Sequence, residues 1–177
     1  MGTPYEHKKS IILIGMPASG KSTIGVKLAR RLEMKFIDTD KMIERREKMT
    51  LQQIIECHGT EYFEKSEEGV LMSLKPRGQV IATGGSAVLY PKAMKHLKKL
   101  GIIIYLDLPL YALKRRLWNL QTRGIVFRSG QNLTGAYHER KPLYEKHCDF
   151  SVQSGTGGAG KVIQSIITEL ERQGYKE

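Results

Sequence analysis

The clearest chemistry in this sequence lies in residues 15–22, GMPASGKS, which match the pattern G-x-x-x-x-G-K-[S/T] at every fixed position. Glycine has no Cβ, so the backbone N–H groups of such a segment can approach phosphate oxygens closely. The Lys21 ammonium group would neutralise the β- and γ-phosphates of a nucleotide, and the Ser22 hydroxyl would bind Mg²⁺. The residues expected to hold the nucleotide are Gly15, Ala18, Ser19, Gly20, Lys21, Ser22 and Thr23.

Asp38 and Asp40 form a second candidate group, at the end of a short predicted strand at 35–38. Side chains two residues apart on an extended segment point to the same side. One carboxylate could bind Mg²⁺, which prefers oxygen ligands, while the other accepts a hydrogen bond from a substrate hydroxyl. A plain helix N-cap is the alternative interpretation of these residues.

The surrounding residues predict the elements that would position both groups. The apolar run at 11–14 predicts a buried parallel strand before the glycine-rich segment. Ile24, Leu28 and Leu32 then recur at helical spacing. A helix N-terminus after such a loop adds unpaired N–H donors and a partial positive charge, which favours phosphate binding over a simple turn between strand and helix.

The rest of the chain alternates predicted strands and helices, which indicates an α/β fold with a parallel sheet flanked by helices. Its 177 residues, 40% of them hydrophobic, suit one domain spanning residues 1–177. Pro142 should kink or restart the predicted helix at 133–148. The other predicted strands are 80–83, 102–106 and 150–153, and the other predicted helices are 40–48, 50–59, 60–74, 91–100, 110–120 and one through 163–167.

The formal net charge of +11 favours anionic ligands or a nucleic acid. The lysines are scattered over predicted helices without the interleaved aromatic residues of single-strand binders, so nucleic-acid binding is not expected. No apolar run could span a bilayer and residues 1–9 lack the core of a signal peptide, so we expect a cytoplasmic monomer without a membrane partner. Cys57 and Cys148 are expected to be reduced thiols, although a disulfide between them stays open.

The order of the motifs resembles that of the shikimate kinase family, from about residue 10 to about residue 167. The shared motifs are the glycine-rich segment, FIDTD at 36–40, the helix from Phe63 to Glu67, TGG at 83–85, Arg123 and ERKPLY at 139–144. The later motifs are specific only through their order and spacing. The resemblance implies a three-layer P-loop kinase fold with a five-stranded parallel sheet, a substrate-binding helical region at about 40–75 and a lid at about 122–132.

Roles in the acceptor site follow from the same resemblance. Asp38 matches the aspartate associated with magnesium, and Asp40 matches the one that binds substrate hydroxyls and positions the attacking oxygen. Gly84 and Gly85 match backbone that touches the substrate, and Arg140 matches an arginine that binds the shikimate carboxylate. A guanidinium group suits that role, because it pairs with a carboxylate through two parallel hydrogen bonds.

On the nucleotide side, the resemblance implies that Arg116 packs on adenine and that the loop at 154–160, including Thr156, wraps around it. Arg123 matches the lid arginine that reaches the phosphates, where it could stabilise the charge of the transferring phosphoryl group. A surface arginine in a loose ion pair is the alternative for both Arg123 and Arg140. Closure of the lid would exclude water and limit the hydrolysis of ATP.

The chain departs from the family at Glu64, where the family carries a second carboxylate-binding arginine. A carboxylate that faces the substrate carboxylate at about 4 Å would cost about 4 kcal/mol at an effective dielectric constant near 20. A hydroxylated amino acid, held by Arg140 at its carboxylate and by Glu64 at its amine, would suit this charge better. Alternatively, Glu64 points to solvent. Two lesser departures are Ser86, in place of the third glycine, and Gly124, in place of the lid proline.

The sequence therefore predicts phosphoryl transfer from ATP to a hydroxyl group of a small molecule. The expected catalytic residues are Lys21, Asp40 and Arg123, and the expected magnesium ligands are Ser22 and Asp38. Shikimate is the leading acceptor, which would place the chain in aromatic amino acid biosynthesis. Another hydroxylated metabolite is the second interpretation. A nucleotide-binding regulator without catalytic activity is the third, and the intact lysine and aspartates argue against it.

Overall fold

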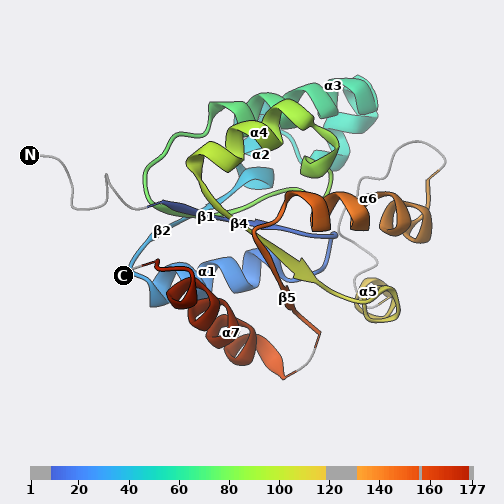
Figure 1. The fold of residues 1–177 in the computed structure, drawn as a ribbon. Coiled ribbons are helices and arrows are strands. Elements are labelled where there is room, and N and C mark those ends of the chain that lie inside the picture. The colour runs from blue at the N-terminus through green and yellow to red at the C-terminus, as the bar shows by residue number, and fades with distance from the viewer. Residues whose placement is uncertain (1–8, 119–130, 156, 176–177) are drawn as a thin grey trace, which may run out of the picture.

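The five strands form one parallel sheet in the order β2-β3-β1-β4-β5 (Figure 1). This computed structural model describes residues 9–118, 131–155 and 157–175. The strands are β1 (Ser10–Ile14), β2 (Lys35–Asp38), β3 (Gln79–Ala82), β4 (Gly101–Asp107) and β5 (Phe150–Gln153). Because all five are parallel, their carboxyl ends meet at one edge, which is where ligands bind in open α/β sheets. The expected five-stranded parallel sheet is confirmed.

Helices cover both faces of the sheet and make the expected three layers. Alternate residues of β1 point to opposite faces: Ile12 packs in a core cluster with Leu97, and Ile11 packs in a second cluster with Leu28 and Ile166. Figure 1 shows α3 and α4 on one face, with α1 and α7 on the other. The helices are α1 (Lys21–Arg31), α2 (Thr39–Glu47), α3 (Leu51–Ser73), the 3-10 turn η1 (Ala87–Leu89), α4 (Pro91–Leu100), α5 (Leu110–Trp118), α6 (Leu133–His147) and α7 (Gly158–Arg172).

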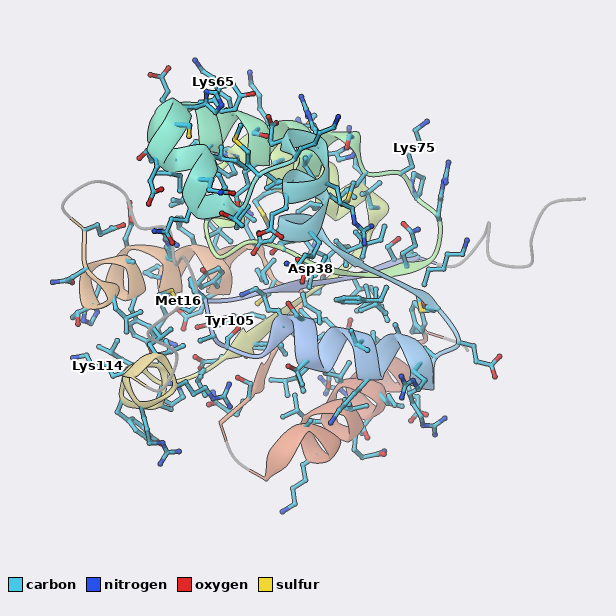
Figure 2. The ribbon with its side chains drawn as sticks, turned by 180° about the vertical axis from the view of Figure 1, so that it is seen from behind. Met16, Asp38, Lys65, Lys75, Tyr105 and Lys114 are labelled. Carbon is cyan, nitrogen blue, oxygen red and sulfur yellow. The ribbon has the colours of Figure 1, made fainter. Side chains whose placement is uncertain are left out.

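Charged side chains cover the outside of these layers. Figure 2 shows Lys65, Lys75 and Lys114 pointing away from the molecule, whereas Met16 and Tyr105 lie between the helix layers. Met16 and Tyr105 are each only 1% exposed. Among the residues that the structure describes, no helix combines the length and the apolar character needed to cross a membrane.

Two helices bear on the detailed expectations. In α3 the backbone at Gly59 is not helical (φ 83°, ψ 168°), so this element consists of two helices that meet at a kink, which confirms the break predicted near Gly59. The expected restart at Pro142 was wrong, because α6 continues through this residue. Arg140 and Tyr144, on either side of the proline, are buried, and this packing stabilises the helix despite the missing hydrogen bond.

Candidate active site

The glycine-rich segment joins the end of β1 to the start of α1. Gly15 and Gly20 have φ values of 147° and 101°, a region that favours glycine. A Cβ at Gly15 would lie 2.7 Å from the carbonyl oxygen of Leu106, so a side chain is excluded there. Gly20 is the N-cap of α1 and has no side chain to cap the helix. The N–H groups of the first turn of α1 can therefore donate to a phosphate.

Lys21 begins α1 and is buried, with 8% of its surface exposed. Its Nζ donates hydrogen bonds of 2.8 Å to the carbonyl oxygens of Gly15 and Met16. Burial lowers the pKa of Lys21 to about 8, and the charges of Asp40 and Asp38 oppose this shift. The negative charge of a bound triphosphate would act in the same direction as these aspartates and keep Lys21 protonated.

Ser22 and Asp38 lie together beside the loop. The Ser22 hydroxyl donates to Asp38 Oδ2 at 2.7 Å, while Asp38 Oδ1 caps α2 by accepting from the backbone N–H of Asp40 at 3.0 Å. Figure 2 shows Asp38 at the sheet, between the helix layers. The capping and metal-binding interpretations of Asp38 are therefore compatible, because they use different oxygens. A hydroxyl and a carboxylate oxygen in contact are ligands of the kind that Mg²⁺ takes.

The magnesium site would need ligands from outside this pair. Within the described ranges, no group of three or more histidine, cysteine, aspartate or glutamate side chains could hold a metal ion. Mg²⁺ in kinases commonly relies on one or two protein ligands together with substrate phosphates and waters. The Ser22–Asp38 pair fits such a site, next to the loop expected to hold the phosphates.

A cavity of about 370 Å³ opens beside the loop and collects most of the expected site residues. Its floor is the loop and the start of α1, and its walls come from α2, α3, the segment after β3, α5 and α6. The expected residues that line it are Ala18, Gly20, Lys21, Ser22, Thr23, Asp40, Gly84, Gly85, Arg116 and Arg140. Residues from six separate parts of the chain thus meet in the space where phosphoryl transfer would occur.

Asp40 faces this cavity from the first turn of α2. Burial raises the pKa of Asp40 to about 6, and the nearby charge of Asp38 adds to the effect, while Lys21 opposes it. A carboxylate with such a pKa is ionised at neutral pH and still basic enough to accept a proton from a hydroxyl group. Position and pKa therefore suit the expected role of Asp40.

Arg140 reaches the cavity from α6 and is almost fully buried, with 1% of its surface exposed. Among the residues that the structure describes, its Nε and Nη1 atoms have no hydrogen-bond partner. A buried guanidinium group with unpaired N–H donors is costly unless a ligand pairs with it. Each of these N–H donors can form a charge-assisted hydrogen bond with an anionic ligand such as a carboxylate. The burial of Arg140 excludes its alternative interpretation as a surface arginine in a loose ion pair.

Arg116 lies at the nucleotide end of the cavity, but its contacts are with protein. Its Nη1 donates to the carbonyl oxygen of Ala18 at 3.0 Å and its Nη2 to that of Ser154 at 3.2 Å. Arg116 therefore ties the glycine-rich loop to the segment after β5. Stacking on adenine stays a prediction.

Other expected residues lie beside the cavity or outside the described residues. Gly15 packs on β4, and Ser19 is buried with an unpaired hydroxyl. Glu64 is half-buried and lines a neighbouring cavity of about 10 Å³, which is the size of one water, together with Ser86, Tyr90 and Arg140. Arg123, Thr156 and most of the expected lid at 122–132 fall outside the described residues.

Leu51 and Tyr90 have no role among the sequence-based predictions, and Glu67 figures there only within the helix from Phe63 to Glu67. Leu51 and Glu67 line the main cavity, and Tyr90 lines the small one. The spacing of Phe63 and Glu67, four residues apart on one helix, could have indicated that both face the site. For Tyr90 the sequence carries no such signal.

A glycine-rich phosphate-binding loop that opens onto a pocket with a buried acid and a buried arginine, two of whose nitrogens are unpaired, defines a P-loop phosphotransferase of small molecules. The family described as shikimate kinase matches residues 17–171 of this chain. Shikimate kinases of a Sulfurihydrogenibium species and of Colwellia psychrerythraea are 32% and 36% identical over 166 and 168 residues. Each alignment covers 93% of this chain, and 99% and 98% of the two relatives. The chain therefore belongs to the shikimate kinase family.

Solved structures agree with this assignment. The shikimate kinase from Acinetobacter baumannii in complex with shikimate superposes with a TM-score of 0.86 at 29% identity, covering 97% of this chain and 98% of that one. The shikimate kinase from Aquifex aeolicus gives a TM-score of 0.80 at 32% identity. These likenesses confirm the P-loop kinase fold.

Proposed function

We propose that this chain transfers the γ-phosphoryl group of ATP to a hydroxyl group of shikimate. The observation that carries the proposal is the position of Arg140, which is buried with its Nε and Nη1 unpaired, in the same cavity as Asp40 and Lys21. Shikimate has a carboxylate for the arginine and hydroxyl groups for the aspartate. Family membership and the likeness to a shikimate-bound relative support this acceptor.

On the nucleotide side, the backbone N–H groups at the start of α1 and the Lys21 ammonium group would hold the phosphates. Mg²⁺ held by Ser22 and Asp38 would supply further neutralisation of the phosphate charge. Lys21 would exchange its two carbonyl partners in the loop for phosphate oxygens. Arg116 would contact the base, and Arg123 from the lid would stabilise the transferring group.

On the acceptor side, Asp40 would orient the reacting hydroxyl and take its proton. The hydroxyl oxygen would form a bond to the γ-phosphorus as the bond from phosphorus to the leaving oxygen of ADP breaks. Gly84 and Gly85 would contact the acceptor through their backbone, and the Tyr144 hydroxyl holds this segment by donating to the carbonyl oxygen of Gly85. Catalysis would come from positioning and electrostatic stabilisation.

Glu64 favours a second candidate acceptor, a hydroxylated amino acid. Its carboxylate lines the small cavity beside Arg140, so an ammonium group bound next to the arginine would gain a partner there. The two acceptors differ in charge on this side of the site. The proposal of shikimate therefore includes the expectation that Glu64 stays clear of the acceptor carboxylate.

ADP release, followed with a coupled assay in the presence of MgATP, separates the candidates. We expect turnover with shikimate. Turnover only with amino-alcohol or amino-acid acceptors would favour the second candidate, and nucleotide binding without turnover over a broad panel would favour a regulator. A monomeric state and a cytoplasmic location are part of the proposal, and light scattering coupled to size-exclusion chromatography tests the first.

A further inference from the structure

Within the described part of the chain, the carboxyl group of Glu67 accepts hydrogen bonds through one of its oxygens, Oε2. Glu67 lies on α3 and is 1% exposed. The Ser86 hydroxyl donates to its Oε2 at 2.6 Å, and the Tyr90 hydroxyl donates to the same oxygen at 2.7 Å. Ser86 precedes η1 and Tyr90 precedes α4, so the two donors come from both ends of one short turn.

The other oxygen of Glu67 lies against Gly84, next to Asp40. A Cβ built on Gly84 would be 2.1 Å from Glu67 Oε1 and 3.1 Å from Asp40 Oδ1. Two acidic side chains therefore flank the same backbone position in the cavity wall. Only glycine leaves room for them.

Arg140 lines this cavity as well, yet it does not pair with Glu67 through Nε or Nη1. The two groups are near enough to interact, because the charge of Arg140 lowers the pKa of Glu67, although burial raises it to about 7 overall. A carboxylate and a guanidinium group buried together normally form a direct, often bidentate, pair. The orientation of Glu67 toward Ser86 and Tyr90 explains why this pair is absent.

We propose that Ser86 and Tyr90 are positioning residues, which hold Glu67 against Gly84 and thereby leave Arg140 unpaired for the carboxylate of the acceptor. This inference rests on the proposed function, because it takes that carboxylate as the partner of Arg140. Without the two hydroxyls, Glu67 turns toward Arg140. The acceptor must then break an internal ion pair before it binds.

The kinetic test removes the donors and compares KM with kcat. In the double variant Ser86→Ala/Tyr90→Phe, KM for shikimate rises about 10-fold, the cost of displacing one charge-assisted pair. The kcat value stays within about 2-fold, because the groups that act on the reacting atoms are unchanged. Ser86→Thr keeps a hydroxyl and so keeps KM near the parent value. Tyr111→Phe, at a side chain that is 71% exposed, is the matched control.

The decisive comparison repeats the double substitution in a Glu67→Gln background. A neutral amide forms no ion pair with Arg140. Removal of the Ser86 and Tyr90 hydroxyl groups in this background therefore leaves KM for shikimate within about 2-fold of the value for Glu67→Gln alone. An equal rise of KM in both backgrounds would overturn the proposal, since it would mean that the hydroxyls act by packing alone. If KM for shikimate is the same in Ser86→Ala/Tyr90→Phe with native Glu67 as in the parent, the proposal is overturned too.

A structural readout separates this proposal from the choice of acceptor. Crystal structures of the parent and of Ser86→Ala/Tyr90→Phe, both without acceptor, should show Glu67 within salt-bridge distance of Arg140 in the variant only. The same Glu67 orientation in both proteins would refute the positioning role. A parent that fails to phosphorylate shikimate would instead refute the proposed function, and the structural comparison would still decide the role of Ser86 and Tyr90.

Discussion

Replacement of Arg140 should raise the stability of the folded protein and, at the same time, weaken acceptor binding about 10²-fold. Arg140 is 1% exposed and two of its nitrogens have no partner, so the folded protein bears the cost of a buried cation that is not fully paired. Arg140→Met removes this cation and keeps a long apolar side chain in its place. Burial lowers the pKa of Lys21 and the charge of Arg140 adds to this effect, so the change makes the protonated form of Lys21 more favourable. The charge of Arg140 also favours the ionised form of Glu67, and this stabilisation is lost.

Together, these effects should make Arg140→Met more stable toward unfolding than the parent protein. Replacing buried ionic groups by apolar side chains of similar size is often stabilising by about 1–4 kcal/mol. At about 2–4 °C per kcal/mol for a chain of this size, we expect the melting temperature to rise by at least about 2 °C. The lost contact with the acceptor is larger: two charge-assisted hydrogen bonds of about 1.5 kcal/mol each correspond to about a 10²-fold higher KM for shikimate.

Thermal unfolding without ligands and initial-rate kinetics with shikimate measure both effects on one preparation. Arg31→Met, at an exposed position near the end of α1, is the control and should change neither quantity by much. An unchanged KM in Arg140→Met would refute the acceptor role of Arg140. A clearly lower melting temperature would refute the argument that this guanidinium group lacks partners in the free protein.

Four further changes test the remaining groups. Asp40, with a pKa of about 6, must be ionised to accept a proton, so kcat should fall as the pH drops below about 6. Asp40→Asn should lower kcat by about 10²-fold or more and remove this fall of kcat at acid pH, which is the acid limb of the pH profile. The pKa of Glu67 is raised to about 7, so protonated Glu67 favours the folded state at low pH and this contribution is lost as the pH rises through 7. Chemical denaturation should therefore show that Glu67→Gln gains stability relative to the parent between about pH 5 and about pH 8. Lys21→Met should abolish most ADP release while the circular dichroism spectrum stays unchanged. Arg123→Ala should lower kcat by about 10²-fold in the same assay.

Each of these predictions has an outcome that contradicts it. Near-normal turnover would exclude Lys21 from catalysis, and an unchanged kcat would exclude Arg123 from the lid's action. A pH profile of Asp40→Asn that keeps the acid limb would assign that limb to another group. A constant stability difference across pH would mean that Glu67 titrates in the folded protein as it does in the unfolded chain.

The parts of the site that depend on local sequence were predictable. The glycine-rich loop follows from the residues themselves, because the backbone needs glycine at positions 15 and 20 whatever the rest of the chain does. The five strands follow from short apolar runs between helical segments. Asp38 and Asp40 were both named as candidates from the sequence, and the structure gives them different contacts: Asp38 caps α2 and accepts from Ser22, while Asp40 lines the cavity.

The parts that depend on distant contacts were not predictable. Glu67 meets Ser86 and Tyr90 only because α3 packs beside the turn that leads into α4, and no local pattern encodes that contact. Likewise, the lack of partners at Arg140 depends on everything that surrounds α6. A restart of the helix at Pro142, one of the two outcomes expected there, is absent for the same reason, because the tertiary packing of α6 outweighs the intrinsic preference of proline against helices.

A crystal structure with shikimate and ADP bound tests the central claim most directly. The account predicts that the shikimate carboxylate pairs with the guanidinium group of Arg140, and that one of the shikimate hydroxyls lies within hydrogen-bond distance of Asp40 on the side of the cavity nearest Lys21. Shikimate bound with its carboxylate elsewhere, or with no hydroxyl at Asp40, would contradict it.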